Sequence, residues 1–411
     1  MAEQLEAYYG LPREVKFCKK CVMSNQRPSS RSEFRHDKTS KTVAIHFDDE
    51  GVCDACRYNE RKAREIDWSR RRNELAELCD RYRRNDSGYD CIVPGSGGKD
   101  SVMAAHLLKY EFDMHPLTVT WAPHIYTDIG RRNHENWIKS GFDNILFSPN
   151  GRIHRLLTRL AFKNLLHPFQ PFILGQKNIG AKFAARYDVP LVFYGESEAE
   201  YGNPIASTLS SLREAKYHTG DNYEDMVLGG TTVKELRDKH AVQMNELLPF
   251  LPMDPDEFEQ KQIAVHYLGY YVKWDPQEAY YFAVEHSGFE ANDRRTEGTY
   301  SKYNSIDDKS DPFHYYTTLI KFGIGRATYD ASQEIRNEKI TREEGVALVK
   351  KFDQEFPQRY FPEFLDYINM TEEEFHRTVD QFRSPHLWKR DGDEWVLRHT
   401  VWQEAEVSLT G

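Results

Sequence analysis

The sequence lacks any apolar run long enough to cross a bilayer, and its opening stretch, MAEQLEAYYGLPREVKF, has no apolar core followed by a small-residue cleavage site. It also lacks an excess of positive charge: the formal net charge is −10 and the pI is near 5.9. Broad contact with nucleic acid normally requires a basic surface. We therefore expect a cytoplasmic protein that neither enters a membrane nor uses large RNA as its partner.

Cysteine is scarce, with six in 411 residues, and four of the six form the pairs Cys18-x2-Cys21 and Cys53-x2-Cys56. Because disulfides are rare in the cytoplasm, paired cysteines indicate a metal. Two such pairs commonly join around one tetrahedral Zn²⁺, which predicts a structural zinc ribbon. An iron–sulfur cluster or a redox pair is compatible with the same spacing and stays open at this stage.

The chain also lacks a Walker A phosphate loop. In DCIVPGSGGKDSVMAAHLL, residues 90–108, a strand-like run precedes glycines and then apolar residues at helical spacing. A glycine turn between a strand and a helix binds phosphate through backbone N–H groups and the helix dipole. Alignment with G-x-x-x-x-G-K-[ST] places Val93 where glycine is required and Asp100 where Ser or Thr is required, so this turn is of another kind.

The six residues SGGKDS, 96–101, resemble the S-G-G-x-D-S pyrophosphate loop (PP-loop) of the ATP pyrophosphatases. The resemblance implies that ATP is cleaved between its α and β phosphates and that AMP is transferred to a carbonyl-type oxygen. It implies that Asp100 contacts Mg²⁺, that Lys99 occupies the variable position, and that the pyrophosphate is held by Ser96, Gly97, Gly98 and Ser101. The simpler alternative is an ordinary glycine-rich turn with Asp100 as a helix cap.

Strand-like and helical segments alternate after this turn, with strands expected at 116–121, 145–147 and 191–194. Such alternation predicts an α/β fold with a parallel sheet and helices on both faces. Ligands of these sheets lie beyond the carboxyl ends of the strands. We therefore expect Trp121 at the ATP site, and Glu196 and Glu198 in contact with substrate or magnesium.

A content of 39% hydrophobic and 13% aromatic residues excludes disorder and leaves room for several domains. We expect a zinc ribbon at 1–60, a charged helical connector at 61–86, a PP-loop (adenine nucleotide α-hydrolase-like) ATP-binding domain at 87–210 and a mainly helical substrate and C-terminal region at 211–411. In the last region the long polar stretch NDRRTEGTYSKYNSIDDKSD is typical of a lid over a polar substrate. Lys321 and Arg326 flank a glycine loop, and we expect both to act on the departing pyrophosphate.

Longer motifs narrow the resemblance. FCKKCVMS, FDDEGVCDAC, VTWAPHIYTDIG, HPFQPFILGQKNIGAKFA, VFYGESEAEYGN, EGTYSKY and KFGIGRATYDASQEIRNEKITREEGV, spread over residues 17–350, are similar to the N-acetyl sugar amidotransferases of bacterial surface-polysaccharide and flagellin-glycan pathways. This implies conversion of an acetamido group on a sugar or nucleotide sugar into an acetamidino group, with ATP, Mg²⁺ and structural Zn²⁺. By the same resemblance, the residues expected to contact the sugar are Glu196, Glu198, Tyr201, Asn203, Glu297, Tyr300 and Lys302.

No glutaminase nucleophile is visible, because position 2 is Ala and neither Cys79 nor Cys91 lies in a glycine-flanked nucleophile turn. The resemblance implies that ammonia comes from partner subunits similar to the glutaminase and cyclase of imidazole glycerol phosphate synthase. A homo-oligomer is compatible with the sequence. The competing interpretations are a tRNA-thiolating PP-loop enzyme, which would need a reactive cysteine near the adenylated base, and a zinc-bearing scaffold that binds nucleotide without catalysis.

Overall fold

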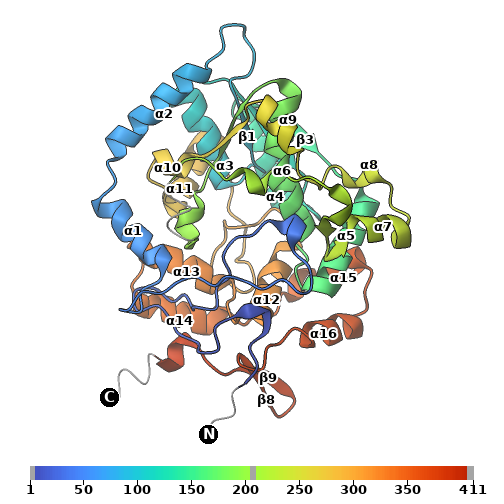
Figure 1. The fold of residues 1–411 in the computed structure, drawn as a ribbon. Coiled ribbons are helices and arrows are strands. Elements are labelled where there is room, and N and C mark those ends of the chain that lie inside the picture. The colour runs from blue at the N-terminus through green and yellow to red at the C-terminus, as the bar shows by residue number, and fades with distance from the viewer. Residues whose placement is uncertain (1–4, 204–209, 405–411) are drawn as a thin grey trace.

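A parallel sheet of five strands lies at the centre of the computed structural model, which describes residues 5–203 and 210–404 (Figure 1). The strands are β1 (Cys91–Pro94), β2 (Pro116–Trp121), β3 (Asp143–Phe147), β4 (Leu191–Tyr194) and β7 (Ala264–Tyr267), in the order β3-β2-β1-β4-β7. The α/β fold with a parallel sheet is thus confirmed. Both faces of the middle strands are covered, which is why these strands are continuously apolar rather than alternating.

Side chains that alternate along β1 enter two different cores. Ile92 packs with Leu117 and Val119 against α5 (Gly151–Leu165) and α6 (Gln170–Tyr187). Cys91 and Val93 point the other way. The layer on that second face consists of α2 (Trp68–Tyr82), α3 (Lys99–His106), α4 (Asp128–Lys139), α10 (Leu268–Tyr271) and α11 (Pro276–Ser287).

The segment expected to be mainly helical begins with short elements and supplies the fifth strand of the sheet. These elements are the hairpin β5 (Val227–Leu228) and β6 (Thr231–Thr232), α7 (Val233–His240), α8 (Met244–Leu247) and α9 (Pro255–Gln260). β7 then pairs with β4 because its run of apolar and aromatic residues matches the buried edge there. The sheet therefore takes one strand from beyond residue 210.

The rest of the chain forms a helical layer below the carboxyl ends of the strands (Figure 1). It comprises α12 (Asp311–Phe322), α13 (Arg326–Arg336), α14 (Arg342–Phe352), α15 (Phe361–Ile368), α16 (Glu372–Asp380) and the hairpin β8 (Trp388–Asp391) with β9 (Glu394–Leu397). The capping box that Thr341 and Glu344 predict at the start of α14 is present. Within the described ranges, no helix is both long and apolar enough to cross a membrane.

The N-terminal segment runs across this helical layer before α1 (Asp54–Arg64) leads it up to the sheet (Figure 1). The guanidinium of Arg342 in α14 donates to the carbonyl oxygens of Cys18 and Cys21, the latter at 3.2 Å. Nearer the N-terminus, the amide of Tyr8 donates to Ser384 Oγ at 2.9 Å. The stretch around Tyr8 is therefore packed against the stretch around Ser384, and the cysteine segment is part of the main body.

Candidate active site

The SGGKDS turn joins β1 to α3, as the sequence predicts. Gly97 has a φ of +82°, and a Cβ at this position would lie 2.7 Å from the Cα of His134 in α4. A Cβ on Gly95 would lie 2.2 Å from the Cβ of Ser101. Contacts this short cannot occur, so both positions require glycine. The tight turn brings the first N–H groups of α3 to the ligand side, which is the arrangement that binds phosphate.

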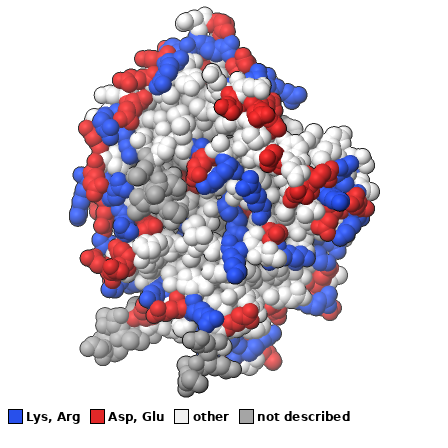
Figure 2. All heavy atoms as spheres, viewed as in Figure 1, with Lys and Arg blue, Asp and Glu red and all other residues white. Residues whose placement is uncertain are grey.

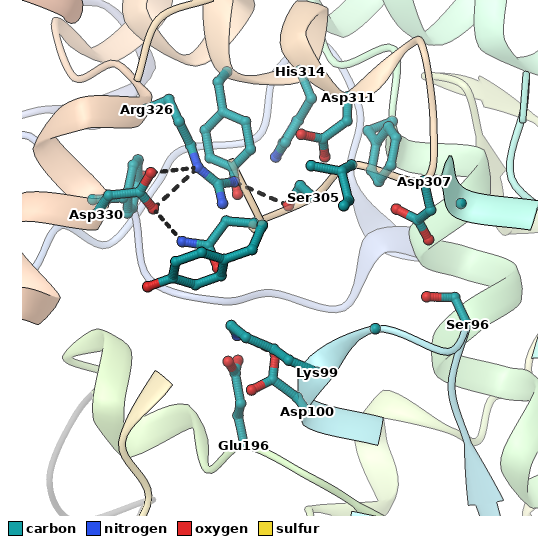
Figure 3. Close-up of a pocket in the computed structure, with 18 of the residues that line it drawn as sticks. Ser96, Lys99, Asp100, Glu196, Ser305, Asp307, Asp311, His314, Arg326 and Asp330 are labelled. Carbon is teal, nitrogen blue, oxygen red and sulfur yellow. Dashed lines mark hydrogen bonds and ion pairs between the residues drawn. The ribbon is translucent and has the colours of Figure 1, made fainter. Parts of the chain in front are cut away.

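A polar cavity of about 390 Å³ lies against this turn, and we call it the turn cavity. One wall comes from the turn and the end of β4, and the opposite wall comes from residues 303–307 with the first turns of α12 and α13. Figure 3 shows Lys99, Asp100 and Glu196 on the first wall and Asp307, Asp311 and Arg326 on the second. A substrate in the turn cavity would therefore contact both halves of the chain.

Acidic groups gather on the first wall. Lys99 forms an ion pair with Asp100, and Asp100 Oδ1 is buried without a hydrogen-bond partner among the described residues. Burial, together with the negative charge of Asp100, raises the pKa of Glu196 to about 8. Mg²⁺ prefers carboxylate oxygens and keeps room for water and phosphate ligands. The free oxygen of Asp100 and the destabilised charge on Glu196 therefore fit a magnesium ion held jointly with a phosphate.

Arg326 is the cation of the opposite wall. Its Nε lies 3.2 Å from Asp330 Oδ1, its Nη1 donates to Ser305 Oγ at 3.1 Å, and its guanidinium carbon lies 4.1 Å from the ring centroid of Tyr315. Asp330 thus fixes the guanidinium at the cavity surface. Burial raises the pKa of Asp307, and the nearby Ser96 has the opposite effect. The second wall therefore comes close to the SGGKDS turn at Asp307.

A second cavity of about 390 Å³ borders the other side of the turn and the end of β4. Glu198 lies there with Arg213 Nη2 at 3.3 Å, and Asn203 Nδ2 donates to Glu198 Oε2 at 2.9 Å. Tyr201 borders this cavity and the turn cavity alike. Three of the predicted sugar contacts, Glu196, Glu198 and Tyr201, therefore border this cavity, and the fourth, Asn203, orients the Glu198 carboxylate.

Trp121 lies in the core rather than in either cavity. Its side chain is 3% exposed and stacks on Phe147, with ring centroids 5.2 Å apart. Helix α6 passes so close that a Cβ on Gly175 would fall 2.0 Å from the indole. Although β2 ends at the site as expected, alternation along the strand directs its last side chain into the helix layer. The structure therefore gives Trp121 no contact with the turn.

Lys321 is the second residue that lies apart from its expected place. It belongs to the last turn of α12, which continues to Phe322 before Gly323 ends it, and its Nζ donates to the carbonyl oxygen of Leu165 at 2.7 Å. Burial lowers the pKa of Lys321 to about 7. It lines a third cavity, of about 440 Å³, together with Arg31. Of the two predicted cations, only Arg326 borders the turn cavity.

The three predicted contacts in the polar loop are engaged elsewhere. Glu297 accepts a hydrogen bond from the amide of Arg359 at 3.0 Å, the hydroxyl of Tyr300 donates to Glu334 at 2.8 Å, and Lys302 Nζ donates to a backbone carbonyl at 3.2 Å. Instead, the five residues that follow, 303–307, reach the turn cavity. The polar loop therefore does line the cavity, but through its residues 303–307 and not through the three residues that were predicted.

Sequence reasoning missed Asp307 and Asp311, which face the phosphate turn from the second wall. Their only signal is the acidic run SIDDKSD, which reads equally well as a solvated loop. It also missed Lys177, which lines the second and third cavities from α6.

Figure 2 shows basic side chains gathered near the middle of one face of this acidic molecule, so its net charge does not describe every surface.

The four paired cysteines form a compact cluster. The Sγ atoms of Cys18 and Cys56 lie 3.9 Å apart, those of Cys21 and Cys53 lie 3.8 Å apart, and all four fall within 4.8 Å of one another. Tetrahedral zinc with Zn–S bonds of about 2.3 Å separates its sulfurs by about 3.8 Å. The cluster could therefore hold a zinc ion. A multi-iron cluster fits less well, because it distributes its thiolates over separate irons and needs a wider spacing.

Magnesium binding at Asp100 and Glu196 is expected to depend on pH. Below a pKa of about 8, Glu196 carries a proton and is a poor ligand, so affinity should rise as pH increases, by about tenfold per unit below that value. The measurement is a Mg²⁺ titration followed by thermal unfolding on both sides of this pKa. Glu196→Gln should abolish the pH dependence, whereas the exposed control Glu214→Gln should retain it. An unchanged pH dependence in Glu196→Gln would exclude Glu196 as a ligand.

Two comparisons with known proteins gave matches to parts of this chain. Residues 297–401, roughly a quarter of the chain, match the C-terminal domain of WbpG-like LPS biosynthesis proteins. The chain is also 38% identical over 52 residues to an uncharacterized protein of Methanocaldococcus jannaschii, a match that covers 13% of this chain and 19% of that protein. The second wall of the turn cavity, from 303 to 333, lies within the WbpG-like region.

Proposed function

We propose that this protein is an ATP-dependent N-acetyl sugar amidotransferase. It adenylates the acetamido oxygen of an N-acetyl sugar or nucleotide sugar, releases pyrophosphate, and replaces that oxygen with nitrogen from ammonia. The product is an acetamidino sugar for LPS O-antigen or flagellin glycan. The observation that carries the proposal is the SGGKDS turn, with Gly97 packed against α4 and with Asp100 and Glu196 facing a polar cavity. The WbpG-like match supports the role in surface-sugar biosynthesis.

Each group of residues around the turn has a role that follows from its position. Ser96, Gly97, Gly98 and Ser101 hold the two phosphates that leave, and Lys99 offsets their charge. Asp100 and Glu196 would hold Mg²⁺, which would supply positive charge to offset the charge of the phosphate oxygens. Arg326 contributes positive charge from the opposite wall, with Asp330 fixing its orientation. Tyr201 and Glu198, with Asn203 behind, bind sugar hydroxyls beside the same turn.

The chemistry explains why ATP is required. An amide oxygen is a poor leaving group, so it must first attack the α phosphorus of ATP, and the bond from that phosphorus to the bridging oxygen breaks. Pyrophosphate leaves with the electron pair, and its capture on the turn favours this step. Ammonia then attacks the activated carbon, and AMP departs with the original amide oxygen. No nucleophilic side chain is needed in this sequence of steps.

The alternative function, tRNA thiolation, needs a reactive thiol at the site. Four of the six cysteines are in the buried cluster, and Cys79 and Cys91 are 0% exposed. Burial raises the pKa of Cys79 to about 12 and that of Cys91 well above its usual value. No cysteine borders the turn cavity or the second cavity within the described ranges. This arrangement favours nitrogen transfer over sulfur transfer.

The isolated chain is expected to convert ATP to AMP and pyrophosphate when an acetamido sugar and an ammonium salt are present, and to make no use of glutamine. Nitrogen from glutamine requires a glutaminase, which we propose is a separate subunit acting with a cyclase-like partner. The measurement is AMP and pyrophosphate formation with a panel of UDP- and CMP-linked N-acetyl sugars, or with tRNA in their place.

The matching controls are the same sugars without their acetyl groups. Turnover with tRNA alone would favour the thiolase, and nucleotide binding without AMP formation would favour a scaffold. Efficient glutamine hydrolysis by this chain alone would contradict the assignment of ammonia supply to a partner.

A further inference from the structure

Replacement of an amide oxygen by nitrogen needs a group that removes a proton from the incoming nitrogen. Ammonia that has attacked carbon carries a positive charge, and it cannot become part of an amidine until one N–H proton leaves. The SGGKDS turn and its magnesium ligands serve the phosphates, and Arg326 is already cationic. The base must therefore be another residue on the walls of the turn cavity.

Two carboxylates on the second wall, Asp307 and Asp311, have no ion-pair partner among the described residues, and Asp311 is the more buried of the two. It is 6% exposed, and no residue in the described parts of the chain donates a hydrogen bond to its carboxylate. Its acidic neighbours differ: Asp330 accepts from the Thr299 hydroxyl at 2.6 Å and pairs with Arg326, and Asp308 accepts from the Ser310 hydroxyl at 2.8 Å. Figure 3 shows Asp311 on the wall that faces Lys99 and Asp100.

The surroundings of Asp311 suit a nitrogen cation better than a metal ion. Among the described residues, the cysteine cluster is the one place where three or more metal-ligating groups converge, so the cavity carboxylates do not form a metal cage. Burial and the negative charges of Asp307 and Asp308 raise the pKa of Asp311 well above its usual value, against the lowering effect of Arg326. A buried carboxyl of this kind accepts a proton readily and pairs with an incoming cation.

We propose that Asp311 is the catalytic base that receives the proton from the attacking nitrogen and then pairs with the cationic amidinium product. This inference rests on the proposed amidotransferase function and assigns its second half-reaction to the wall opposite the phosphate turn. The WbpG-like region, residues 297–401, then supplies a catalytic side chain as well as one wall of the cavity.

The nitrogen lone pair forms the new C–N bond to the adenylated carbon, and one N–H proton moves to a carboxylate oxygen of Asp311. The C–O bond to AMP then breaks, its electron pair leaves on the phosphate oxygen, and Asp311 passes its proton to that oxygen, which restores the carboxylate. The product is a planar amidinium cation, whose N–H groups match a carboxylate in the way that a guanidinium does. No oxidant, reductant or further cofactor is involved.

A binding experiment tests the cation site without knowledge of the sugar. Acetamidinium chloride, a minimal form of the product group, should raise the thermal midpoint of the full chain relative to sodium chloride at equal ionic strength. Asp311→Asn, which keeps the shape of the side chain, should lose this shift, whereas the exposed control Asp293→Asn should keep it. A shift of equal size in Asp311→Asn, or none in the unmodified chain, would overturn the proposal.

A kinetic experiment separates the two half-reactions with whichever panel sugar supports AMP formation. Asp311→Asn should release pyrophosphate at the normal rate in a single turnover but form amidine from ammonium about 10²-fold more slowly. Hydroxylamine, whose adduct loses its proton to water more easily, should restore much of the rate. Slower pyrophosphate release rescued by higher Mg²⁺ would instead identify Asp311 as a magnesium ligand. Failure of the unmodified chain to form AMP counts against the proposed function, while the binding experiment still decides the cation site.

Discussion

Cys53→Ser is expected to abolish zinc binding and to prevent the chain from reaching its folded state at physiological temperature. A structural zinc site contributes on the order of 10 kcal/mol to folding, which equals or exceeds the net stability of most domains. The effect should reach the active site, because α1 begins directly after Cys53 and carries Lys62. The ammonium of this buried lysine lies 2.9 Å from Glu200 Oε1 and donates to the carbonyl of Trp274, and Glu200 lies on the segment that follows Glu196.

The measurement is zinc content per chain with thermal unfolding in the presence and absence of a chelator. Cys79→Ala is the matched control, since Cys79 is equally buried but lies outside the cluster. It should retain one zinc per chain and lose about 1 kcal/mol for a small cavity. A Cys53→Ser chain that is zinc-free yet unfolds at the same temperature as the unmodified protein would contradict the structural role. Finding iron and sulfide in anaerobic preparations would show that the four cysteines hold an iron–sulfur cluster and not zinc.

Asp100→Asn is expected to slow adenylation by about 10²-fold or more while the protein stays folded. The substitution keeps the size of the side chain but removes the negative charge that would hold Mg²⁺ beside the departing pyrophosphate. Asp100 Oδ1 has no hydrogen-bond partner in the described structure, whereas Oδ2 pairs with the buried Lys99, so some loss of stability should accompany the substitution. Single-turnover release of AMP and pyrophosphate across a Mg²⁺ titration measures the effect, with thermal unfolding as the check on folding.

Asp221→Asn, which alters an exposed carboxylate, is the control and should leave both half-reactions intact. If Asp100→Asn releases pyrophosphate at the normal rate and Mg²⁺ dependence, Asp100 serves only as the ion-pair partner of Lys99. Formation of ADP and phosphate by the unmodified protein would exclude the PP-loop assignment altogether. Arg326→Ala is a less clean test, because it would leave Asp330 buried without its cation and so would also lower stability.

The parts of the structure that depend on residues close together in the sequence could be predicted well. Four strands, the helices between them and the glycine turn follow from short apolar runs, helical spacing and the steric freedom of glycine, all of which act within a few residues. The cysteine cluster is equally local in each of its halves, because each C-x2-C pair presents two sulfurs to one point. The capping box at the start of α14 is local in the same way, because Thr341 and Glu344 are three positions apart in the sequence.

The sequence by itself therefore determined four of the five strands of the parallel sheet, the glycine turn and the four clustered cysteines. Only the tertiary structure decided which distant side chains complete the site: Asp307 and Asp311 arrive from α12 and the loop before it, whereas Lys321 ends on the carbonyl of Leu165 and Trp121 enters the core. The physical reason is that the direction of a side chain depends on the packing of the element that carries it. A shift of one residue along a strand reverses the face, and a helix that continues for one further turn carries its lysine away from the ligand.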